Sequence, residues 1–550
     1  MIGFETAPRP KWQRRRVGPA YALNGMIAAA HPLIAETGLQ VLKSGGNAVD
    51  AAVAAGLTAA VVMPEMCGLG GDLFAIVQAP GAAPVAVLGS GISPRAATIE
   101  QMRAAGDGAH MPLDGPLSIG VPGMVHAYGA LLERFGSQDL ASLAGPAIGH
   151  AENGFPLTVL GAVAIAAFPE LIQRCEATAA VLMPGGRAPR AGEILRQTDL
   201  ARTLMAIAAE GPEIFYRGKL ARRMAEAVQA LGGALSAEDL AEHQTVIEAT
   251  IATSYRGYTI HQTGLPSQGM ILLEALNIVE NAAPEALAAG DAGAVHTLVE
   301  AAKLAYADRM GFARDPAFGP TPMDVLLSKP WAARRFAEID AGRSAEETPA
   351  GAMTGGDTTY FCVVDGDGMM VSLIQSVSSA FGSGVIAGDT GVILNNRVGR
   401  GFSLEEGHPN LFAPGKKTMH TLNCWSMQDP NGVPVMVGGT PGGDGQPQWN
   451  LQMLVGLIDA GLDVQAATEL PRWSIWPGTD PANRPNPYRL EAETRMAEET
   501  RTGLTALGHR LRPMGGWGAG GAAQIIARDP DSGVLAGGSD PRAEGLALGF

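Results

Sequence analysis

The first part of the chain carries the spacing of hydrophobic and polar positions that is typical of helices. In SGGNAVDAAVAAGLTAA, Asn47 precedes an alanine-rich run and Asp50 follows three residues later, which predicts a capped helix. Further helices are predicted to end at Gly232 and Gly233, to begin after Ser236, and to cover about residues 290–312. This half of the sequence is therefore expected to be rich in helix.

After Met353 the pattern changes to strands separated by glycine turns. TTYFCVVD and MMVSLIQSVS flank DGDG and predict a β-hairpin, and TLNCWSM and VPVMVGG flank QDPNG in the same way. PQWNLQMLVGLIDAGLD predicts one more helix. Because strands and helices are segregated along the chain, the pattern favours an α+β arrangement of sheet layers covered by helices.

The first hairpin brings two hydroxyl groups together. A three-residue loop pairs Thr358 with Ser376 at the start of the strand, and a two-residue loop shifts this register by one. The strand pattern alone is also explained if Thr358 and Thr359 are ordinary β-formers and Ser376 faces solvent. Both interpretations stay open at this level.

Composition and charge exclude several classes of protein. With 550 residues, 46% hydrophobic and 17% charged, the chain is expected to form one large composite domain or two to three smaller ones. A net charge of −15 argues against a broad basic surface for nucleic acid, and the basic run KWQRRR is expected to be a solvated tail. We find no 18-residue apolar stretch and no signal peptide, so we expect a cytoplasmic protein that does not bind membranes.

The cysteines and histidines show no metal-site spacing. Four cysteines are scattered through the chain without a CxxC pattern and are expected to be buried thiols. The glycines of GLGGDLF lack the GxGxxG spacing of a dinucleotide loop and run into an apparent strand. We therefore predict neither a metal nor a cofactor.

An ordered set of motifs resembles the γ-glutamyltransferase family of N-terminal-nucleophile hydrolases. The set comprises HPLIAETGLQVLKSGGNAVDAAVAA, GLGGDLF, VPGMVHAYGALLERFG, EAAKLAYADR, DTTYFCVVD, FGSGV, LNNR followed by GFS, and GGTPGGDGQPQ, and it runs from about Gly25 to the C-terminus. The resemblance implies a four-layer αββα sandwich built from both fragments of a self-cleaved precursor. An N-terminal arm (1–24), a helix-rich large subunit (25–357) and a small subunit (358–550) would together form one composite domain.

The resemblance also implies where the precursor cuts itself. The Thr358 hydroxyl would attack the carbonyl of Asp357, and water would hydrolyse the resulting ester. Gly355 and Gly356 would give the backbone the freedom to reach the strained geometry. This explains why two glycines and an aspartate precede the doubled threonine.

By the same resemblance, the new N-terminus carries the catalytic chemistry. The α-amino group of Thr358, with an ordinary pKa of about 7.7 to 8, would deprotonate its own hydroxyl. The backbone N–H groups of Gly442 and Gly443 would stabilise the oxyanion, and Ser376 would hydrogen-bond to the nucleophile. Without the flanking motifs, the glycine pair would be interpreted as a turn.

The sequence departs from glutathione-cleaving members of the family where they bind glutamate. Ser90 stands where those members have the arginine that binds the α-carboxylate, and Gly401 where they have the acidic residue that binds the α-amino group. Other binding positions of the family are also changed here, at His420, Thr421, Ser378 and Arg397. The pattern resembles the acylase and amidohydrolase branch, which includes oxamate amidohydrolase and cephalosporin acylase-like members.

These observations predict a self-processing threonine amidohydrolase that acts on a small amide carrying a carboxylate. Arg397 and His420 are candidates to bind the substrate anion, with a surface ion pair and a hydrogen-bonded core histidine as the alternatives. A γ-glutamyl hydrolase or transferase and a non-catalytic binding member stay open as other functions. We expect the two fragments to associate and possibly to dimerise further, and the choice between hydrolysis and transfer is open.

Overall fold

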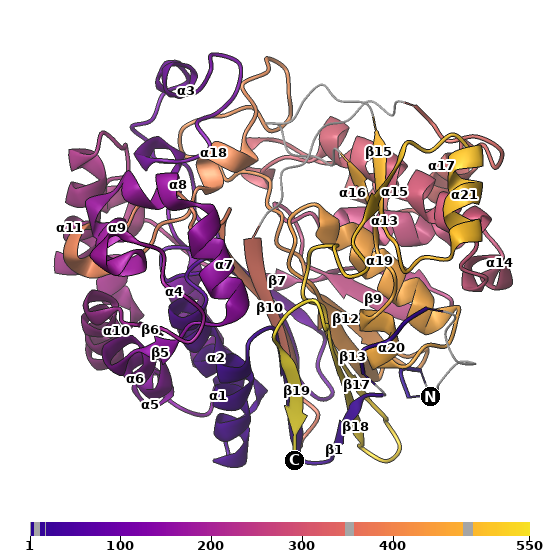
Figure 1. Cartoon of the computed structure of the whole chain (residues 1–550), viewed down its shortest axis with the longest axis horizontal. Coiled ribbons are helices and arrows are strands. Elements are labelled where there is room, and N and C mark those ends of the chain that lie inside the picture. Colours follow the sequence, from indigo (N-terminus) through magenta and orange to yellow (C-terminus); the bar gives the residue numbers. More distant parts are fainter. Residues whose placement is uncertain (1, 5–11, 17, 347–356, 477–487) are drawn as a thin grey trace.

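Two seven-stranded antiparallel sheets lie face to face in the middle of the computed structural model, which describes residues 2–4, 12–16, 18–346, 357–476 and 488–550 (Figure 1). The first sheet has the order β19 (Leu546–Gly549), β2 (Gly25–Ala29), β10 (Asp357–Asp365), β11 (Met370–Ser378), β3 (Asp72–Gln78), β4 (Val85–Gly89) and β7 (Val246–Ala249). The second has the order β1 (Ala20–Ala22), β18 (Leu535–Ser539), β17 (Gln524–Arg528), β13 (Pro434–Gly439), β12 (Trp425–Gln428), β9 (Tyr258–Gln262) and β8 (Ile251–Tyr255). A three-stranded sheet contains β14 (Trp473–Trp476), β15 (Arg489–Glu493) and β16 (Leu511–Met514). A two-stranded sheet pairs β5 (Phe155–Pro156) with β6 (Ile194–Leu195).

Helices cover the outer face of each sheet (Figure 1). The first sheet packs against α1 (Pro32–Lys43), α2 (Ala48–Val62), α4 (Met124–Phe135), α5 (Leu140–Leu143), α6 (Gly145–Asn153), α7 (Val159–Ala167), α8 (Pro169–Gln173), α9 (Glu176–Leu182), α10 (Thr198–Glu210), α11 (Lys219–Ala230) and α12 (Ala237–Ala241). The second packs against α13 (Gly269–Val279), α14 (Pro284–Ala288), α15 (Ala292–Phe312), α16 (Met323–Leu326), α17 (Lys329–Phe336), α19 (Gly445–Ile458), α20 (Val464–Thr468) and α21 (Glu498–Ala506). A smaller apolar cluster joins α3 (Ile99–Ala105) and α18 (Arg397–Gly401).

Three apolar layers separate these four structural layers. Along β10, Phe361 and Val363 belong to the core shared with the first set of helices, whereas Tyr360 and Cys362 belong to the core between the sheets. Because alternate residues of a strand point to opposite faces, a strand buried on both faces needs a continuous apolar run. The predicted αββα sandwich is confirmed.

The hairpin register predicted from a three-residue loop is also confirmed. Thr359 pairs with Gln375, and the pairing continues without a shift to Val364 and Met370. A bulge between Asp357 and Thr359 interrupts the ladder at the start of β10. β10 also pairs with β2, and β11 with β3, so the hairpin occupies the centre of the first sheet.

Local sequence signals set several helix boundaries. The Asn47 side chain accepts from the N–H groups of Val49 and Asp50, and the Asp50 carboxylate accepts from the Asn47 N–H, forming the predicted capping box of α2. Ser236 caps α12 in the same way. α11 ends at Ala230, two residues before Gly232 takes a φ of 87°. Residues 421–424 lie outside β12, so the second hairpin starts later than predicted.

The solvated tail predicted for the basic run is wrong for its described part. The Glu469 carboxylate accepts from the N–H groups of Arg15 and Arg16, at 2.8 and 2.9 Å, and the Arg15 guanidinium lies 4.7 Å from the Trp517 ring centre. A buried carboxylate therefore holds this segment through its backbone, which the charge pattern could not reveal.

Two further expectations concern burial and membranes. The four cysteines are all buried and unpaired, as predicted. Within the described parts of the chain, no helix combines the length and the apolar character that crossing a bilayer requires.

Candidate active site at one edge of the central strands

Four polar side chains lie in a row across neighbouring strands of the first sheet. Ser376 at the end of β11 pairs with Asp72 at the start of β3, and the hairpin register places Thr358 on the other side of Ser376. The pairing of Gly89 with Leu73 extends the row to Ser90, directly after β4. These four residues are at most 2% exposed. Because paired residues share a face, the row lies at the edge of the core between the sheets.

The two predicted hydroxyl groups meet. The Thr358 hydroxyl donates a hydrogen bond to the Ser376 hydroxyl oxygen over 3.2 Å, and that oxygen also accepts from the Ser378 N–H at 2.7 Å. Thr359 points to the opposite face, where its hydroxyl lies 3.6 Å from the Met63 sulfur. Ser376 is fully buried, so the alternative of a solvent-facing serine is wrong.

The glycine pair lies in the loop between β13 and α19. Gly442 and Gly443 have φ values of 130° and 54°, which favour glycine, and a Cβ on Gly442 would collide with the Trp449 ring. Among the described residues, neither N–H group of the pair donates to an acceptor. The Gln268 side-chain amide donates to the Gly443 carbonyl at 2.9 Å and to the Thr421 carbonyl at 2.5 Å, which ties the two loops together.

Thr358 and Gly442 line the same cavity, of about 90 Å³. Ligand pockets usually measure about 300–1,000 Å³, so this space holds one group of a ligand rather than a whole molecule. The cavity wall also includes Met63, Met66 and Leu160. A reacting carbonyl placed here would lie between the threonine hydroxyl and the glycine loop.

A buried carboxylate that the sequence analysis missed links the predicted binding residues. One oxygen of Asp72 accepts from His420 Nε2 at 2.9 Å and lies 3.4 Å from Arg397 Nε. His420 Nδ1 accepts from the Leu422 N–H, so Nε2 carries the ring proton. Burial, and then the charge of Arg397, lower the pKa of His420 to about 4. The histidine is therefore a neutral donor near pH 7.

The surroundings of Arg397 correct one sequence interpretation. Arg397 is 4% exposed and its Nη1 donates to the Thr421 hydroxyl at 3.3 Å, so the alternative of a surface ion pair is wrong. The histidine alternative, a hydrogen-bonded core residue, describes the contacts of His420. Binding of a substrate anion by Arg397 and His420 stays a prediction.

The remaining predicted positions lie around the same row. The hydroxyls of Ser90 and Ser378 are buried without a hydrogen-bond partner among the described residues, and Ser378 has a strained φ of 92°. A Cβ on Gly401 would collide with the Thr418 side chain, so this position has no room for an acidic residue unless Thr418 moves. Gly355 and Gly356 lie outside the described residues.

The second and third glycines of GLGGDLF allow close backbone packing. A Cβ on Gly70 would collide with the Ile393 carbonyl, and one on Gly71 with the Ser376 carbonyl. Asp72–Gln78 then forms β3, so no helix follows the glycines as a dinucleotide loop requires. The glycine run brings the backbone close to β11 and places Asp72 beside Ser376.

One further cluster combines residue types that bind metals. His296, Glu300 and His509 are buried with their ligand atoms within 4.8 Å of one another. The Lys303 ammonium lies 2.7 Å from the Glu300 carboxylate, and His296 Nδ1 is 2.8 Å from His509 Nε2. The Lys303 ammonium group already balances the charge of the Glu300 carboxylate, which disfavours a metal ion at this position.

Comparison with known proteins identifies the family. Residues 34–550 match the family model of Gamma-glutamyltranspeptidase. The chain belongs to this family. It is 38% identical to the glutathione hydrolase-like YwrD proenzyme of Bacillus subtilis, over 96% of this chain and 98% of that protein. It is 36% identical to the oxamate amidohydrolase proenzyme of Klebsiella pneumoniae, with the same coverage.

A solved structure shows the same fold. The cephalosporin acylase from Bacillus halodurans superimposes with a TM-score of 0.89 at 35% identity, over 100% of this chain and 99% of that one. The predictions of an N-terminal-nucleophile hydrolase fold and of a hydrolase of this family are therefore confirmed. The relatives are named as hydrolases, amidohydrolases and acylases, which supports amide hydrolysis by this member of the Gamma-glutamyltranspeptidase family.

The Asp72–Arg397 pair should be coupled in stability. Asp72→Asn removes the carboxylate beside the buried Arg397 guanidinium, and breaking a buried pair typically costs about 3–5 kcal/mol. The double variant Asp72→Asn with Arg397→Gln removes both charges and should lower the thermal midpoint by less than the sum of the single variants. Arg95→Gln, which breaks an exposed pair with Glu242, is the control and should have little effect. Additive single effects would contradict the coupling.

Burial of His420 predicts a pH dependence of stability. Its pKa falls from about 6.5 in the unfolded chain to about 4 in the folded chain, so between these values the unfolded chain binds the proton and the folded chain does not. Stability should therefore decrease as the pH falls from about 6.5 to 4. His420→Gln should reduce the difference in thermal midpoint between pH 7 and pH 5. Equal differences in the variant and the wild type would show that His420 does not contribute.

Proposed function

We propose that this chain is a self-processing amidohydrolase whose nucleophile is Thr358, at the N-terminus of a fragment that covers residues 358–550. The observation that carries the proposal is the hydrogen bond from the Thr358 hydroxyl to Ser376, in the cavity that Gly442 also lines. The β-branched Thr358 stands at the start of a central strand, and its hydroxyl is hydrogen-bonded to the neighbouring strand, which limits its positions and suits a nucleophile.

Self-cleavage would proceed through an ester. The Thr358 hydroxyl oxygen bonds to the Asp357 carbonyl carbon and the C–N bond breaks. The nitrogen takes the hydroxyl proton and becomes the free α-amino group of Thr358. Water then hydrolyses the ester, which leaves a carboxylic acid at Asp357 and restores the hydroxyl. The ladder irregularity between Asp357 and Thr359 lies at this bond and supports its choice.

The same residue would then cleave substrate. The α-amino group takes the hydroxyl proton as the oxygen attacks the substrate carbonyl, and the N–H groups of Gly442 and Gly443 stabilise the oxyanion. The proton passes to the leaving amine, and water hydrolyses the acyl-enzyme. Neither glycine N–H group donates to an acceptor among the described residues, which supports their use in stabilising the oxyanion.

The two fragments should stay associated after the cut. Residues before 358 supply β2, β3, β4 and β7 of the first sheet, and residues from 358 onward supply β11, β19 and all of β10 except Asp357. The second sheet is shared in the same way. We propose that large (25–357) and small (358–550) fragments, with the arm (1–24), form one composite domain.

For the substrate, we propose a small amide that carries a carboxylate and no adjacent ammonium group. Ser90 and Gly401 leave the ends of a glutamyl group without charged partners, and unpaired buried charges are costly. Arg397 offers a fork of donors, which Asp72 and Thr421 hold in place. A γ-glutamyl hydrolase or transferase is the alternative, because relatives at 31% identity are named glutathione hydrolases.

Alanine replacements of Thr358 and Ser376 should distinguish the roles of the two hydroxyl groups. Thr358→Ala should abolish both self-cleavage and amide hydrolysis, because no other group supplies nucleophile and base together. Mass spectrometry and N-terminal sequencing check the cut, and the small fragment should begin Thr-Thr-Tyr-Phe. Ser376→Ala should slow both reactions by about 2- to 10-fold, since one hydrogen bond contributes about 0.5–1.5 kcal/mol.

The matched control is Thr359→Ala, on the same strand but facing the opposite side. This variant should still cleave itself and hydrolyse the amide substrate at the wild-type rates. A protein that stays full length and is fully active, or an active Thr358→Ala variant, would overturn the mechanism; uncut and inactive wild type would favour a binding role.

Replacement of Arg397 tests the substrate class. Arg397→Gln should reduce kcat/KM about 10- to 100-fold more for a carboxylic acid substrate than for its neutral methyl ester, because a charge-assisted hydrogen bond contributes about 1.5–3 kcal/mol. The ratio within one variant cancels any general loss of active protein. An unchanged ratio, or strong hydrolysis of γ-glutamyl p-nitroanilide by the wild type, would favour γ-glutamyl transfer.

A further inference from the structure

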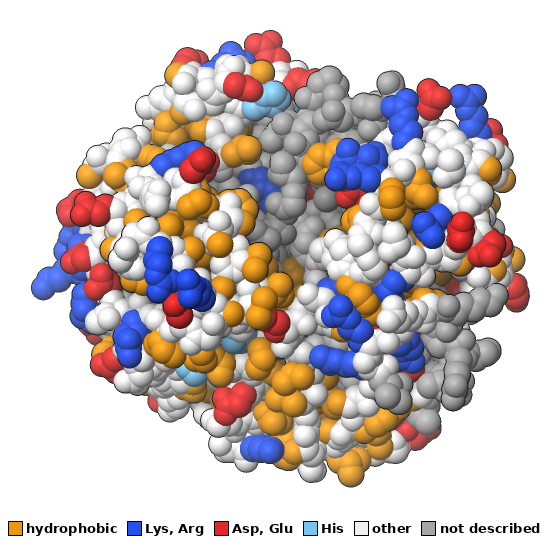
Figure 2. Space-filling view, viewed as in Figure 1, with side chains coloured by type: hydrophobic (Ala, Val, Ile, Leu, Met, Phe, Trp, Pro, Cys, Tyr) orange, Lys and Arg blue, Asp and Glu red, His pale blue; other side chains and the backbone are white. Residues whose placement is uncertain are grey.

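Helix α7 presents apolar side chains to solvent close to the candidate active site. Val159, Leu160 and Val163 are 60%, 43% and 59% exposed, and Phe168 just after the helix is 40% exposed. Figure 2 shows hydrophobic side chains gathered where α7 lies in Figure 1. Single exposed apolar residues are ordinary, but a group beside a reactive side chain indicates a binding surface.

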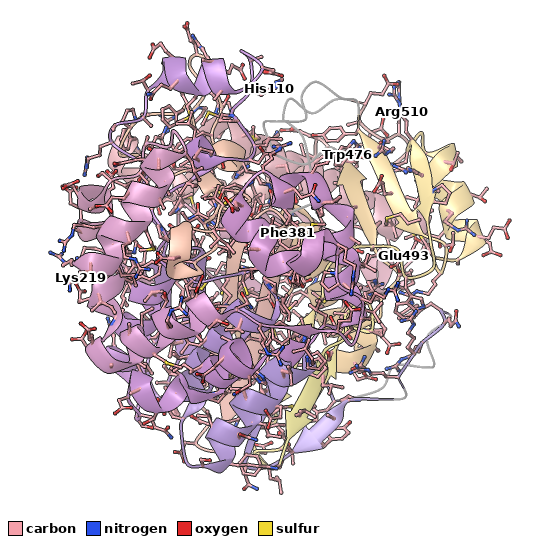
Figure 3. The ribbon with its side chains drawn as sticks, turned by 60° about the vertical axis from the view of Figure 1, so that its left-hand side comes forward. His110, Lys219, Phe381, Trp476, Glu493 and Arg510 are labelled. Atoms are coloured by element: carbon pink, nitrogen blue, oxygen red, sulfur yellow. The ribbon has the colours of Figure 1, made fainter. Side chains whose placement is uncertain are left out.

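Residues of the small fragment fix both ends of α7. The Glu544 carboxylate accepts from the N–H groups of Val159 and Leu160 at 2.9 and 3.2 Å. At the other end, the rings of Phe168 and Phe381 meet at 6.1 Å in a T-shaped contact. Phe381 follows β11 closely and is labelled among the purple helices at the centre of Figure 3. The helix is therefore held in a set position relative to the hairpin that carries Thr358.

One face of α7 borders the cavity of Thr358. Leu160 lines the cavity together with Met63 and Met66, whereas Val163 does not. Met63 is fixed to the nucleophile strand, because the Thr359 hydroxyl donates to its sulfur at 3.6 Å. Three apolar side chains thus form one wall beside the reacting position.

The buried polar cluster and the apolar wall come from different elements. Arg397, His420 and Asp72 form the cluster at the start of β3. Met63 and Met66 after α2 and Leu160 on α7 form the wall, in a cavity that Glu65, Arg542 and Glu544 also line. Asp72 lies on the β11 and β3 side of Thr358, whereas the cavity reaches Ala30, directly after β2 on the other side. A substrate bound across Thr358 would therefore place its carboxylate and an apolar group on opposite sides of the scissile bond. A second protein copy is a poorer occupant, because this short helix offers far less than the roughly 1,200–2,000 Å² of a stable interface.

We infer that Leu160, Met63 and Met66 form an apolar subsite that takes an aromatic or alkyl group on the nitrogen side of the scissile amide. The inference rests on the proposed function, because it places Thr358 at the scissile carbonyl. The subsite narrows the substrate class to amides of apolar amines, with the carboxylate on the acyl side.

A pair of amides with one acyl group tests the subsite. Succinanilic acid carries a phenyl group on the amide nitrogen, and succinamic acid carries none. Leu160→Ser should raise KM for succinanilic acid about 10-fold and leave KM for succinamic acid unchanged, because only the anilide contacts the wall. Val163→Ser, one turn further along the exposed side of α7, is the matched control and should change neither value.

Other outcomes separate this inference from the proposed function. Equal effects of Leu160→Ser on both amides, or equal behaviour of Leu160→Ser and Val163→Ser, would overturn the subsite while Thr358 chemistry stands. If the wild type hydrolyses neither amide, calorimetry of succinanilic acid binding replaces KM. Weaker binding to Leu160→Ser than to Val163→Ser would support the subsite even where turnover fails, and equal binding would overturn it. Self-cleavage should be normal in both variants.

Discussion

The pairing of β10 with β11 is the constraint on which the rest of the site depends. Both strands lie in the middle of a sheet that is covered on both faces, so their register cannot slip without moving apolar side chains into the wrong layer. That register brings the Thr358 and Ser376 hydroxyls within 3.2 Å. It also decides which of the two adjacent threonines faces the row of polar side chains.

The polar row shows how a charged site can lie at the edge of an apolar core. Asp72 would be costly to bury alone, but His420 donates to it and the Arg397 guanidinium lies beside it. His420 is neutral near pH 7, so the cluster carries one negative and one positive charge. The arrangement holds Arg397 and Thr421 in place through contacts that cross from one half of the sandwich to the other.

The fold explains how a member of the Gamma-glutamyltranspeptidase family can keep its cleavage elements while its substrate-binding side chains change. The elements that we propose cleave an amide are a threonine at a strand end and a glycine loop whose N–H groups have no acceptor among the described residues. Both depend on backbone geometry. The elements that would select a substrate are side chains at the ends of strands and on α7, and these can change without altering the sheets. Selection of a new amide therefore needs few substitutions in the fold.

The sequence by itself determined the features that depend on local pattern. Two apolar runs on either side of a glycine turn predicted the hairpin and limited its register to two choices, and Asn47 with Asp50 predicted the start of α2, because these signals act between residues close in the chain. The ordered motifs predicted the family and the αββα layers. Tertiary structure alone decided that Asp72 joins Arg397 and His420, that Glu469 holds Arg15 and Arg16, and that α7 borders the cavity. These contacts join residues that are hundreds of positions apart or on separate elements, and no spacing in the sequence encodes where packed sheets and helices bring them together.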